Sequence, residues 1–431
     1  MAGSRRRLAL VLAALVAAPL AGADPRIKHV VLLVMENRPT DMFFGWAQKE
    51  LEGIDGLSGD EYNLNDISDP SKGSERVQRG KANYVCEHAS MMSHDIYRGD
   101  FFGPGSWNGT RPYPEPSSSG YLQENKGNKE IMWQFSPEQV PIKMALAKEF
   151  ALVDRYYSSF PGPSTPNHLF LHSATSAGCT QTYSAYHCER GKTFPQRTIY
   201  QSLMEANLSW AYFFNDSAFV YFMDFFNTPK GKAGVLPYDD FYHRASQGTL
   251  PNFSWIAPRQ AINQTTRKGP NDDHPCHDVA LGERLLKDTY EALRAGPGWN
   301  QTLFLVTYDD AGGWYDHVPP VLGVPPPDDE KSCPDATDFS WTGGRVPMLL
   351  ISPWVSRGRV IHGPSGSPGT PGRPFANSAY EHSSVSATLK NLFNLSAFLT
   401  KRDAWSGSFH ELLADSPRQD APMHLPDAPP P

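Results

Sequence analysis

Short apolar runs, each about as long as one β-strand, recur along the chain. They occupy residues 29–35, 151–153, 210–214, 253–257, 303–306 and 345–351. Runs without alternating polar residues are typical of strands in a parallel sheet, because helices there cover both faces. The pattern therefore predicts a set of fully buried strands spread over most of the chain.

Segments with apolar residues at spacings of three and four lie between these runs. They predict helices at 144–150, 199–205, 279–293 and 385–393, and a further helix starting at Leu169. Buried strands that alternate with such helices indicate an α/β fold, here an α/β/α sandwich with a largely parallel central sheet. Residues 46–130 are polar and rich in Gly, Asp, Ser and Pro, so we expect an irregular excursion there.

The chain of 431 residues shows no repeat of solenoid period and no linker that divides it. We expect one domain over residues 24–415. A Pro-rich tail, residues 416–431, is predicted to be disordered. The hydrophobic fraction of 39% is enough for a substantial core.

Polar side chains follow two of the predicted strands. Glu36 and Asn37 come directly after the first run, and Asp309 and Asp310 follow the run that starts at residue 303. Open α/β folds bind ligands at the carboxyl ends of their strands. Two adjacent carboxylates repel each other unless one is protonated or a cation lies between them. We therefore predict a divalent metal ion of unknown identity on these four side chains, with an acidic surface turn as the alternative.

A proline-rich turn, residues 161–167, carries two hydroxyls ahead of a predicted helix. A hydroxyl at a helix N-terminus suits a nucleophile whose product is a bound phosphate, and a metal ion would lower its pKa. Ser164 is the candidate nucleophile and Thr165 the neighbouring alternative. Taken alone, either residue could equally be an ordinary turn or cap residue.

Three histidines complete the candidate chemistry: His88, His274 and His317. Imidazoles can hydrogen-bond phosphoryl oxygens or protonate a leaving alkoxide. The alternative is an exposed loop residue for His88 and structural turn residues for the other two. With the metal and the hydroxyl, the set matches in-line phosphoryl transfer through a covalent phosphoenzyme, and it is also compatible with hydrolysis of sulfate esters.

Residues 1–23 have the pattern of a secretory signal peptide. Arg5–Arg7 precede an apolar core from Leu8 to Leu20, and small residues follow at 21–23. An uncleaved anchor is the alternative. No later run reaches about 18 apolar residues, so no further transmembrane segment is expected. Glycosylation sequons begin at Asn108, Asn207, Asn215, Asn252, Asn263, Asn300 and Asn394, which supports a secreted or lumenal glycoprotein.

The formal charge of -7 and the lack of a basic run argue against nucleic acid as a partner. The chain has five cysteines and no CxxC pattern, which argues against a zinc–thiolate site. Cys179 is close enough to Cys188 to close a small loop, and Cys276 with Cys333 is a possible second bridge. Spacing alone does not determine the pairing, and an odd number leaves one thiol over.

Several blocks of the sequence together resemble the phosphoesterase family of phospholipases C and acid phosphatases, which belongs to the alkaline phosphatase-like superfamily. The blocks are Val34–Arg38, Gly162–Asn167, Asn271–Pro275, Tyr308–Asp310 with His317–Pro319, Arg345–Pro347, Pro353–Trp354, Glu381–Ser384 and Leu399–Trp405. They extend over residues 27 to 410 and are most similar to those of the plant non-specific phospholipases C.

The resemblance implies that Glu36, Asn37, Asp309 and Asp310 bind the metal and that Ser164 is the nucleophile. It also implies family roles for His88, His274 and His317. Four positions depart from the phospholipase pattern: Ser164 stands in place of Thr, His168 in place of Arg, and Asp310-Ala311 in place of Glu-His.

We therefore expect a phospholipase C that cleaves glycerophospholipids such as phosphatidylcholine or phosphatidylethanolamine at a membrane surface. The products would be diacylglycerol and a phosphorylated head group. An acid phosphatase for soluble monoesters is the first alternative, since Ser with paired Asp resembles that branch. A non-catalytic lipid-binding glycoprotein is the second. Aromatic loops at 219–222 and 225–226 are candidates for lipid contact or for the core, and the oligomeric state stays open.

Overall fold

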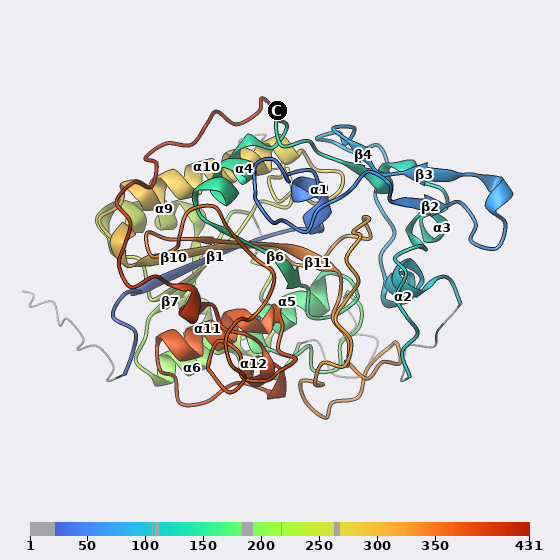
Figure 1. Cartoon of the computed structure of the whole chain (residues 1–431). Coiled ribbons are helices and arrows are strands. Elements are labelled where there is room, and N and C mark those ends of the chain that lie inside the picture. The colour runs from blue at the N-terminus through green and yellow to red at the C-terminus, as the bar shows by residue number, and fades with distance from the viewer. Residues whose placement is uncertain (1–21, 106, 108–111, 183–192, 217, 263–267) are drawn as a thin grey trace, which may run out of the picture.

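The computed structural model describes residues 22–105, 107, 112–182, 193–216, 218–262 and 268–431. One central sheet has helices on both of its faces, so the chain forms the α/β/α sandwich that the sequence predicts (Figure 1). The expected signal peptide falls mainly on residues 1–21, outside the described residues. Among the described helices, none combines the length and the apolar character that crossing a bilayer requires.

The strands of the central sheet follow the order β12-β6-β11-β10-β1-β9-β7-β8, with β13 paired to β6. Their bounds are β1 (His29–Met35), β6 (Ala151–Tyr157), β7 (Trp210–Phe214), β8 (Val235–Pro237), β9 (Phe253–Ala257), β10 (Thr302–Tyr308), β11 (Arg345–Ile351), β12 (Arg359–Ile361) and β13 (Tyr380–Glu381). The apolar runs therefore became the central strands, while the short edge strands β8, β12 and β13 had no such signal.

The sheet is largely parallel, as expected, with one exception among the described strands. β11 runs antiparallel to both neighbours, β10 and β6. Its pairing with β6 shifts register between Val346 and Met348, where Pro347 has no backbone N–H to donate. Strands β1, β9, β10 and β11 are buried along their whole length, since helices cover both faces.

Helices cover both faces of the sheet. Their bounds are α1 (Thr40–Phe44), α2 (His94–Phe102), α3 (Tyr121–Glu124), α4 (Pro141–Glu149), α5 (Ser164–Ser173), α6 (Ile199–Glu205), α7 (Asp224–Asn227), α8 (Pro229–Ala233), α9 (Tyr238–Gln247), α10 (Val279–Ala295), α11 (Ser383–Leu392) and α12 (Lys401–Trp405). Helices α4, α9 and α10 pack on one face of the sheet, and α5, α6, α11 and α12 pack on the other (Figure 1).

Helix α5 begins earlier than the sequence predicts. The expected start was Leu169, but Ser164 is already the first helical residue, after the extended Pro163. Pro166 is compatible with this start because the first turn of a helix leaves its N–H groups without intrahelical partners. The candidate nucleophile therefore lies in the first helical turn and not in the preceding loop.

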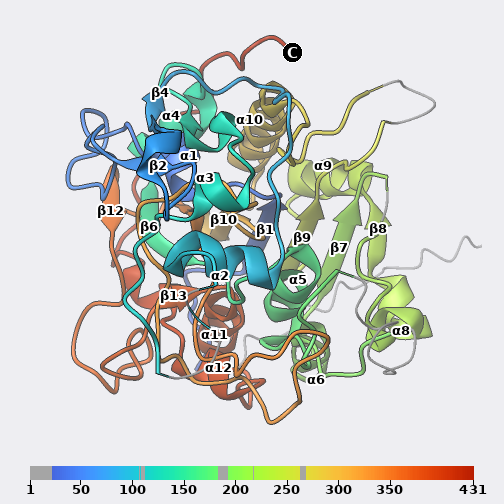
Figure 2. The same cartoon turned by 90° about the vertical axis from the view of Figure 1, so that its right-hand side faces the viewer.

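The polar excursion from residue 46 to 130 lies over the carboxyl ends of the central strands (Figure 1). It contains β2 (Tyr62–Leu64), β3 (Ser74–Arg76), β4 (Gln78–Arg79), α2 and α3, and β4 pairs with β5 (Trp133–Gln134). Figure 2 views the molecule from this side, with α2 and α3 in front of the strands. The excursion contacts the turn after β10, since Asn125 Nδ2 donates to the Gly313 carbonyl at 3.4 Å.

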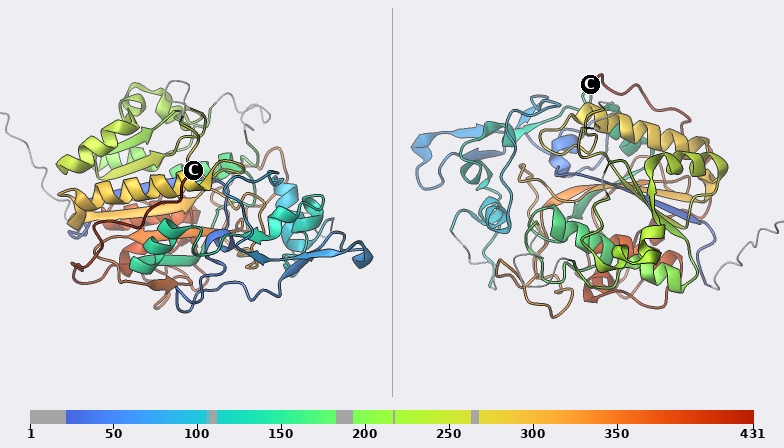
Figure 3. Two further views of the ribbon diagram at one scale, coloured as in Figure 1. Left: turned by 90° about the horizontal axis from the view of Figure 1, so that it is seen from above. Right: turned by 180° about the vertical axis from the view of Figure 1, so that it is seen from behind.

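The segment 416–431, for which the sequence predicts disorder, contains no helix or strand but lies along α10 (Figure 3). Ala421 and Leu425 are buried. Lys287 of α10 donates to the Leu425 carbonyl at 2.6 Å, and Tyr290 donates to the Pro422 carbonyl at 2.5 Å. The structure differs from the expectation because side chains of α10 satisfy backbone carbonyls that proline-rich sequence leaves unpaired.

The Cys276–Cys333 bridge, which the sequence left as a possibility, is wrong. Cys276 forms a disulfide with Cys86, 190 residues away, with 4.8 Å between the two Cα atoms. The pairing follows from the excursion folding back over the carboxyl ends of the strands, which spacing along the sequence does not reveal. The other suggested pairing, Cys179–Cys188, involves Cys188, which lies outside the described residues.

Candidate active site

The two acidic motifs meet because their strands are neighbours. β1 and β10 are parallel, and Met35 pairs with Tyr308 at the last position of both strands. Glu36 and Asn37 therefore leave the sheet at the same level as Asp309 and Asp310. The Asn37 backbone N–H donates to Asp309 Oδ1 at 2.9 Å, which ties the two turns together.

Two sharp turns allow this close approach. Asn37 has a φ of 59°, in the left-handed region that Asn tolerates better than most residues. Gly312 has a φ of 66°, and a Cβ atom placed on it would lie 2.2 Å from the Asn37 carbonyl oxygen. Gly312 also donates its N–H to Asp310 Oδ1 at 2.7 Å, so the glycine both permits the turn and orients the carboxylate.

The hydroxyl of Ser164, at the start of α5, lies beside the side chains of Glu36, Asn37 and Asp310. Its Oγ lies 3.3 Å from Asp310 Oδ2 and 3.4 Å from both Glu36 Oε2 and Asn37 Oδ1. Thr165 is buried, and its hydroxyl has no hydrogen-bond partner among the described residues. Of the two candidate nucleophiles, Ser164 is therefore the one that contacts the acidic residues.

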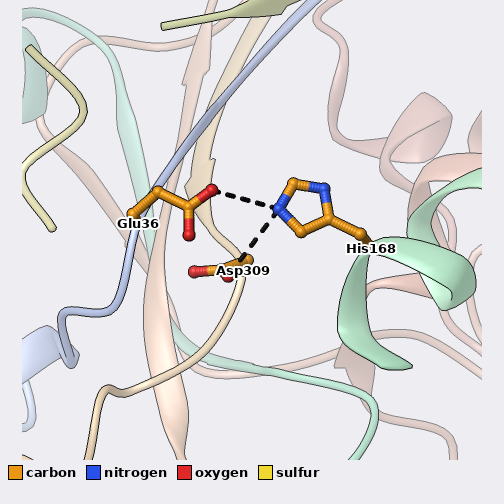
Figure 4. A group of neighbouring side chains, drawn as sticks. All are labelled: Glu36, His168 and Asp309. Carbon is orange, nitrogen blue, oxygen red and sulfur yellow. Dashed lines mark hydrogen bonds and ion pairs between the residues drawn. The ribbon is translucent and has the colours of Figure 1, made fainter. Parts of the chain in front are cut away.

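His168 was a departure from the family pattern in the sequence, and the structure places it inside the site. It lies one helical turn after Ser164 in α5. Figure 4 shows its ring directed toward Glu36 and Asp309. His168 Nε2 lies 3.2 Å from Glu36 Oε1 and 3.7 Å from Asp309 Oδ2. The i, i+4 spacing, which puts both side chains on one face of α5, was the signal for it.

Residues from three other segments contact Glu36, Asp309 and Asp310, and no local pattern in the sequence indicates Tyr97 or Gln260. Tyr97 of α2 donates to Asp310 Oδ1 at 3.2 Å, and Gln260 donates through Nε2 to Glu36 Oε1 at 3.0 Å. His382 Nε2 lies 2.5 Å from the Asp309 carbonyl oxygen. These contacts hold the acidic side chains in place from several sides.

The buried carboxylates strongly affect one another. Glu36 is 3% exposed, while Asp309 and Asp310 are fully buried. Burial raises the pKa of Glu36 to about 8, and the charges of Asp272 and Asp310 add to this effect. Burial also raises the pKa values of Asp309 and Asp310, helped by Glu36 and Asp309 respectively. A positive charge would relieve this repulsion.

The residues fit a divalent cation. Ligand atoms that share a cation at about 2.1–2.4 Å lie about 3.0–3.4 Å apart when they are neighbours in its coordination shell. The distances from Ser164 Oγ to the three surrounding oxygens fall in this range. Asp309 Oδ2 is buried and accepts no hydrogen bond within the described part of the chain, so it has a free acceptor for a cation.

His274 lies on a turn that borders the site. The backbone N–H of Glu36 donates to the Asp272 carbonyl at 2.8 Å, and the His274 N–H donates to Asp272 Oδ1 at 3.2 Å. His274 Nδ1 is 2.6 Å from the Pro275 carbonyl oxygen. Burial lowers the pKa of His274, which favours the neutral ring.

His88 is exposed and lies two residues from Cys86, whose disulfide attaches this loop to the turn of His274. Its ring is close to the carboxylates of Glu87 and Glu130. The disulfide therefore brings the segments of His88 and His274 together, although about 190 residues separate them in the sequence.

His317 belongs to a different cluster. Its Nδ1 lies 2.7 Å from Asp41 Oδ2 and its Nε2 lies 3.2 Å from Asp55 Oδ1. Asp41 is also paired with the buried Arg345 at 2.6 Å. Both ring nitrogens are therefore engaged with carboxylates other than those around Ser164. The structure does not place His317 with the residues that the sequence grouped it with.

Comparison with known proteins identifies the family. The model of the phosphoesterase family matches residues 27–396. The chain belongs to the phosphoesterase family. It is 39% identical over 412 residues to non-specific phospholipase C4 of Arabidopsis thaliana, covering 93% of this chain and 74% of that protein. Identity to the Arabidopsis non-specific phospholipase C1 is also 39%, over 93% of this chain and 74% of that protein.

More distant relatives are bacterial. The non-hemolytic phospholipase C of Burkholderia pseudomallei is 25% identical over 78% of this chain and 52% of its own length. The matched region contains the residues that converge at the strand ends, from Glu36 to Asp310. The family match therefore includes Glu36, Asn37, Asp309 and Asp310 as well as Ser164.

Proposed function

We propose that this phosphoesterase is a phospholipase C that hydrolyses glycerophospholipids, with Ser164 as its nucleophile. The observation that carries the proposal is the position of Ser164 Oγ, within 3.4 Å of side-chain oxygens of Glu36, Asn37 and Asp310. The relatives named as non-specific phospholipases C over 93% of the chain support the substrate class.

Glu36, Asn37, Asp309 and Asp310 are the residues that would hold a divalent cation, with the hydroxyl of Ser164 beside them. When bound, the cation would lower the pKa of that hydroxyl and stabilise negative charge on the phosphoryl group. The helix N-terminus adds to this effect, because the free N–H groups of the first turn of α5 favour an anion. Tyr97 keeps Asp310 oriented through its hydrogen bond.

In the first step, a bond forms between Ser164 Oγ and phosphorus as the bond from phosphorus to the diacylglycerol oxygen breaks. Ser164 gives its hydroxyl proton to Asp310 Oδ2, which lies 3.3 Å from Oγ, and the leaving oxygen takes up a proton. His274 in its protonated form is our candidate for this donor: its Nδ1–H donates to the Pro275 carbonyl, and its Nε2–H is the proton given to the substrate. His88, on the loop attached to the same turn, is our candidate for a phosphoryl contact. Water then attacks phosphorus in the resulting seryl phosphodiester and breaks its bond to Ser164 Oγ, which releases the phosphorylated head group and restores Ser164.

Exposed apolar side chains on loops beside the site suit a membrane surface. Met91, Tyr221 and Ile262 are 39%, 42% and 53% exposed. Each is within two residues of a group that contacts the site: the Met92 sulfur accepts from Asn37, the Phe219 ring packs on His168, and Gln260 donates to Glu36. We assign these three side chains to contact with the lipid surface. Of the other candidate aromatics, Phe226 is buried in the core.

Paired assays test the proposal. Purified protein is expected to release phosphorylated head group from phosphatidylcholine vesicles, and Ser164→Ala is expected to lower the rate by at least about a thousandfold. Thr165→Ala is the matched control and should stay within a few-fold of the wild type. Acid-quenched protein should carry phosphocholine on the peptide that contains Ser164.

The alternatives correspond to other outcomes of the same assays. Faster turnover of a soluble chromogenic monoester than of vesicles would assign an acid phosphatase and overturn the substrate class. Ser164→Ala with undiminished hydrolysis would overturn the nucleophile. Binding of vesicles without turnover of either substrate would favour the lipid-binding glycoprotein. A secreted or lumenal location rests on the pattern of residues 1–23, and sequencing the mature N-terminus after expression tests it.

A further inference from the structure

His168 directs one ring nitrogen at the acidic group. Its Nε2 faces Glu36 Oε1 at 3.2 Å and Asp309 Oδ2 at 3.7 Å (Figure 4). The three potential ligand atoms all lie within 4.8 Å of one another. Neighbouring ligands of a cation bound at about 2.0–2.1 Å are separated by about 2.8–3.4 Å, so a small movement would bring all three onto one ion.

The surroundings of His168 leave its ring no other polar role. Within the described part of the chain, Nδ1 has no hydrogen-bond partner. Aromatic rings surround it, with Phe219 at 5.2 Å, His172 at 6.3 Å and Trp255 at 6.0 Å between ring centroids. The packing therefore fixes the ring in an orientation that directs Nε2 toward the acids.

Glu36 connects this nitrogen to the nucleophile. Its Oε2 lies 3.4 Å from Ser164 Oγ, while its Oε1 lies 3.2 Å from His168 Nε2. Asp309 Oδ2, the other acidic atom beside His168, is buried and accepts no hydrogen bond from the described residues. Three groups thus lie together: Asp309 Oδ2, the Glu36 carboxylate that also contacts Ser164, and His168 Nε2.

We propose that His168 is a metal ligand through Nε2, alongside Glu36 and Asp309. This inference rests on the proposed function, because it concerns the cation at the same site. The imidazole changes which ion the site prefers. A site built only from oxygen atoms suits Mg²⁺ or Ca²⁺, whereas an added imidazole nitrogen favours ions such as Zn²⁺, Mn²⁺ or Fe²⁺.

Spectroscopy of the Mn²⁺-loaded protein tests this directly. Pulsed EPR is expected to detect ¹⁴N coupling from a coordinated imidazole in the wild type. His168→Phe, which keeps an aromatic ring but removes the nitrogens, is expected to bind Mn²⁺ without that coupling. His172→Phe is the matched control: this residue lies one turn further along α5, is equally buried and contacts the Tyr200 hydroxyl at 3.0 Å. It should retain the ¹⁴N signal.

Competition titrations of the chelator-treated protein give an independent measure. His168→Phe is expected to weaken Zn²⁺ binding by at least about tenfold, as losses around metal sites typically do. Binding of Ca²⁺ should change by much less, since oxygen ligands remain. Circular dichroism and the melting temperature establish that each variant is folded.

The outcomes separate this inference from the proposed function. Unchanged ¹⁴N coupling or unchanged Zn²⁺ affinity in His168→Phe would overturn the role of His168. Mn²⁺ bound to the wild type without ¹⁴N coupling would do the same, while leaving the oxygen-ligand site and Ser164 intact. A wild-type protein that binds no divalent cation would overturn both the inference and the metal assignment of the proposed function.

Discussion

Ser164 Oγ lies 3.3 Å from Asp310 Oδ2, although 146 residues separate the two in sequence. Ser164 is the first residue of α5, and Asp310 is the second residue after the end of β10. Both are therefore positioned by regular elements of the sandwich. Rigid support of this kind matters because an error of about 1 Å in the position of a reacting group can cost a hundredfold in rate.

Gly312→Ala should disrupt this arrangement. The added Cβ would lie 2.2 Å from the Asn37 carbonyl, and Gly312 has a φ of 66°. We expect a loss of stability of at least about 2 kcal/mol and a drop in kcat of about tenfold or more, measured by denaturant unfolding and vesicle hydrolysis. Gly323→Ala is the matched control, with a φ of 76° and nothing within 4 Å of the added Cβ. If both variants lose the same stability and keep full activity, the contact with Asn37 does not matter.

Divalent cations should stabilise the folded protein. Glu36, Asp309 and Asp310 repel one another when charged, and an ion that binds only the native state raises its stability, by about 2.7 kcal/mol at a hundredfold excess over Kd. We expect a higher melting temperature on adding Mn²⁺ to chelator-treated protein. Asp309→Asn should lose most of this gain. Glu87→Gln, in a different and exposed acidic group, is the control and should keep it. Equal gains in all three proteins would place the ion elsewhere.

His317 should make stability fall at alkaline pH. Burial alone would lower the pKa of His317, but the Asp41 carboxylate outweighs this effect and raises the pKa to about 9. A folded pKa above the unfolded value stabilises the fold below about pH 6.5, and this stabilisation is lost as pH rises toward 9. We expect His317→Gln to flatten the decline in the free energy of unfolding between these pH values. His243→Gln, at an exposed position in α9, is the control and should decline like the wild type. An unchanged slope in His317→Gln would contradict the ion pair.

The exposed apolar side chains beside the site should matter only at an interface. Tyr221→Ser and Met91→Ser are each expected to slow hydrolysis of phosphatidylcholine vesicles by about fivefold to tenfold, since each removes about 1–1.5 kcal/mol of apolar contact. Hydrolysis of a short-chain phosphatidylcholine below its micelle concentration should not change. Phe375→Ser removes an apolar side chain that is 52% exposed, in the segment between β12 and β13, and serves as the control. Equal losses on both substrates would place Tyr221 and Met91 in catalysis or folding instead.

The sequence by itself determined the central sheet. The runs at 29–35, 210–214, 253–257 and 345–351 have the bounds of β1, β7, β9 and β11. These strands are buried on both faces, so nearly every residue in them must be apolar, and such a run is visible without any partner. Edge strands such as β12 escaped notice because three residues on a half-exposed edge need no continuous apolar run.

The sequence also pointed to Glu36, Asn37, Asp309, Asp310 and Ser164, because polar residues at a strand end or a helix start mark ligand sites in this class of fold. These residues converge only because β1 and β10 are neighbours in the sheet. The two strands pair His29 with Thr302, which is 273 residues further along the chain. The histidines carried no comparable local signal. An isolated imidazole has the same sequence context whether it is exposed, paired or catalytic.

Only the tertiary structure decided which of these side chains meet. His168 lies against Glu36, and His317 lies beside Asp41 and Arg345. A disulfide joins Cys86 of the excursion to Cys276. Such contacts depend on how distant segments pack, and packing depends on shape and charge over the whole chain. Local patterns determine strands and helices because backbone geometry repeats within a few residues. The chemistry of this site arises where separate segments of the chain come together, and only the folded chain specifies that meeting.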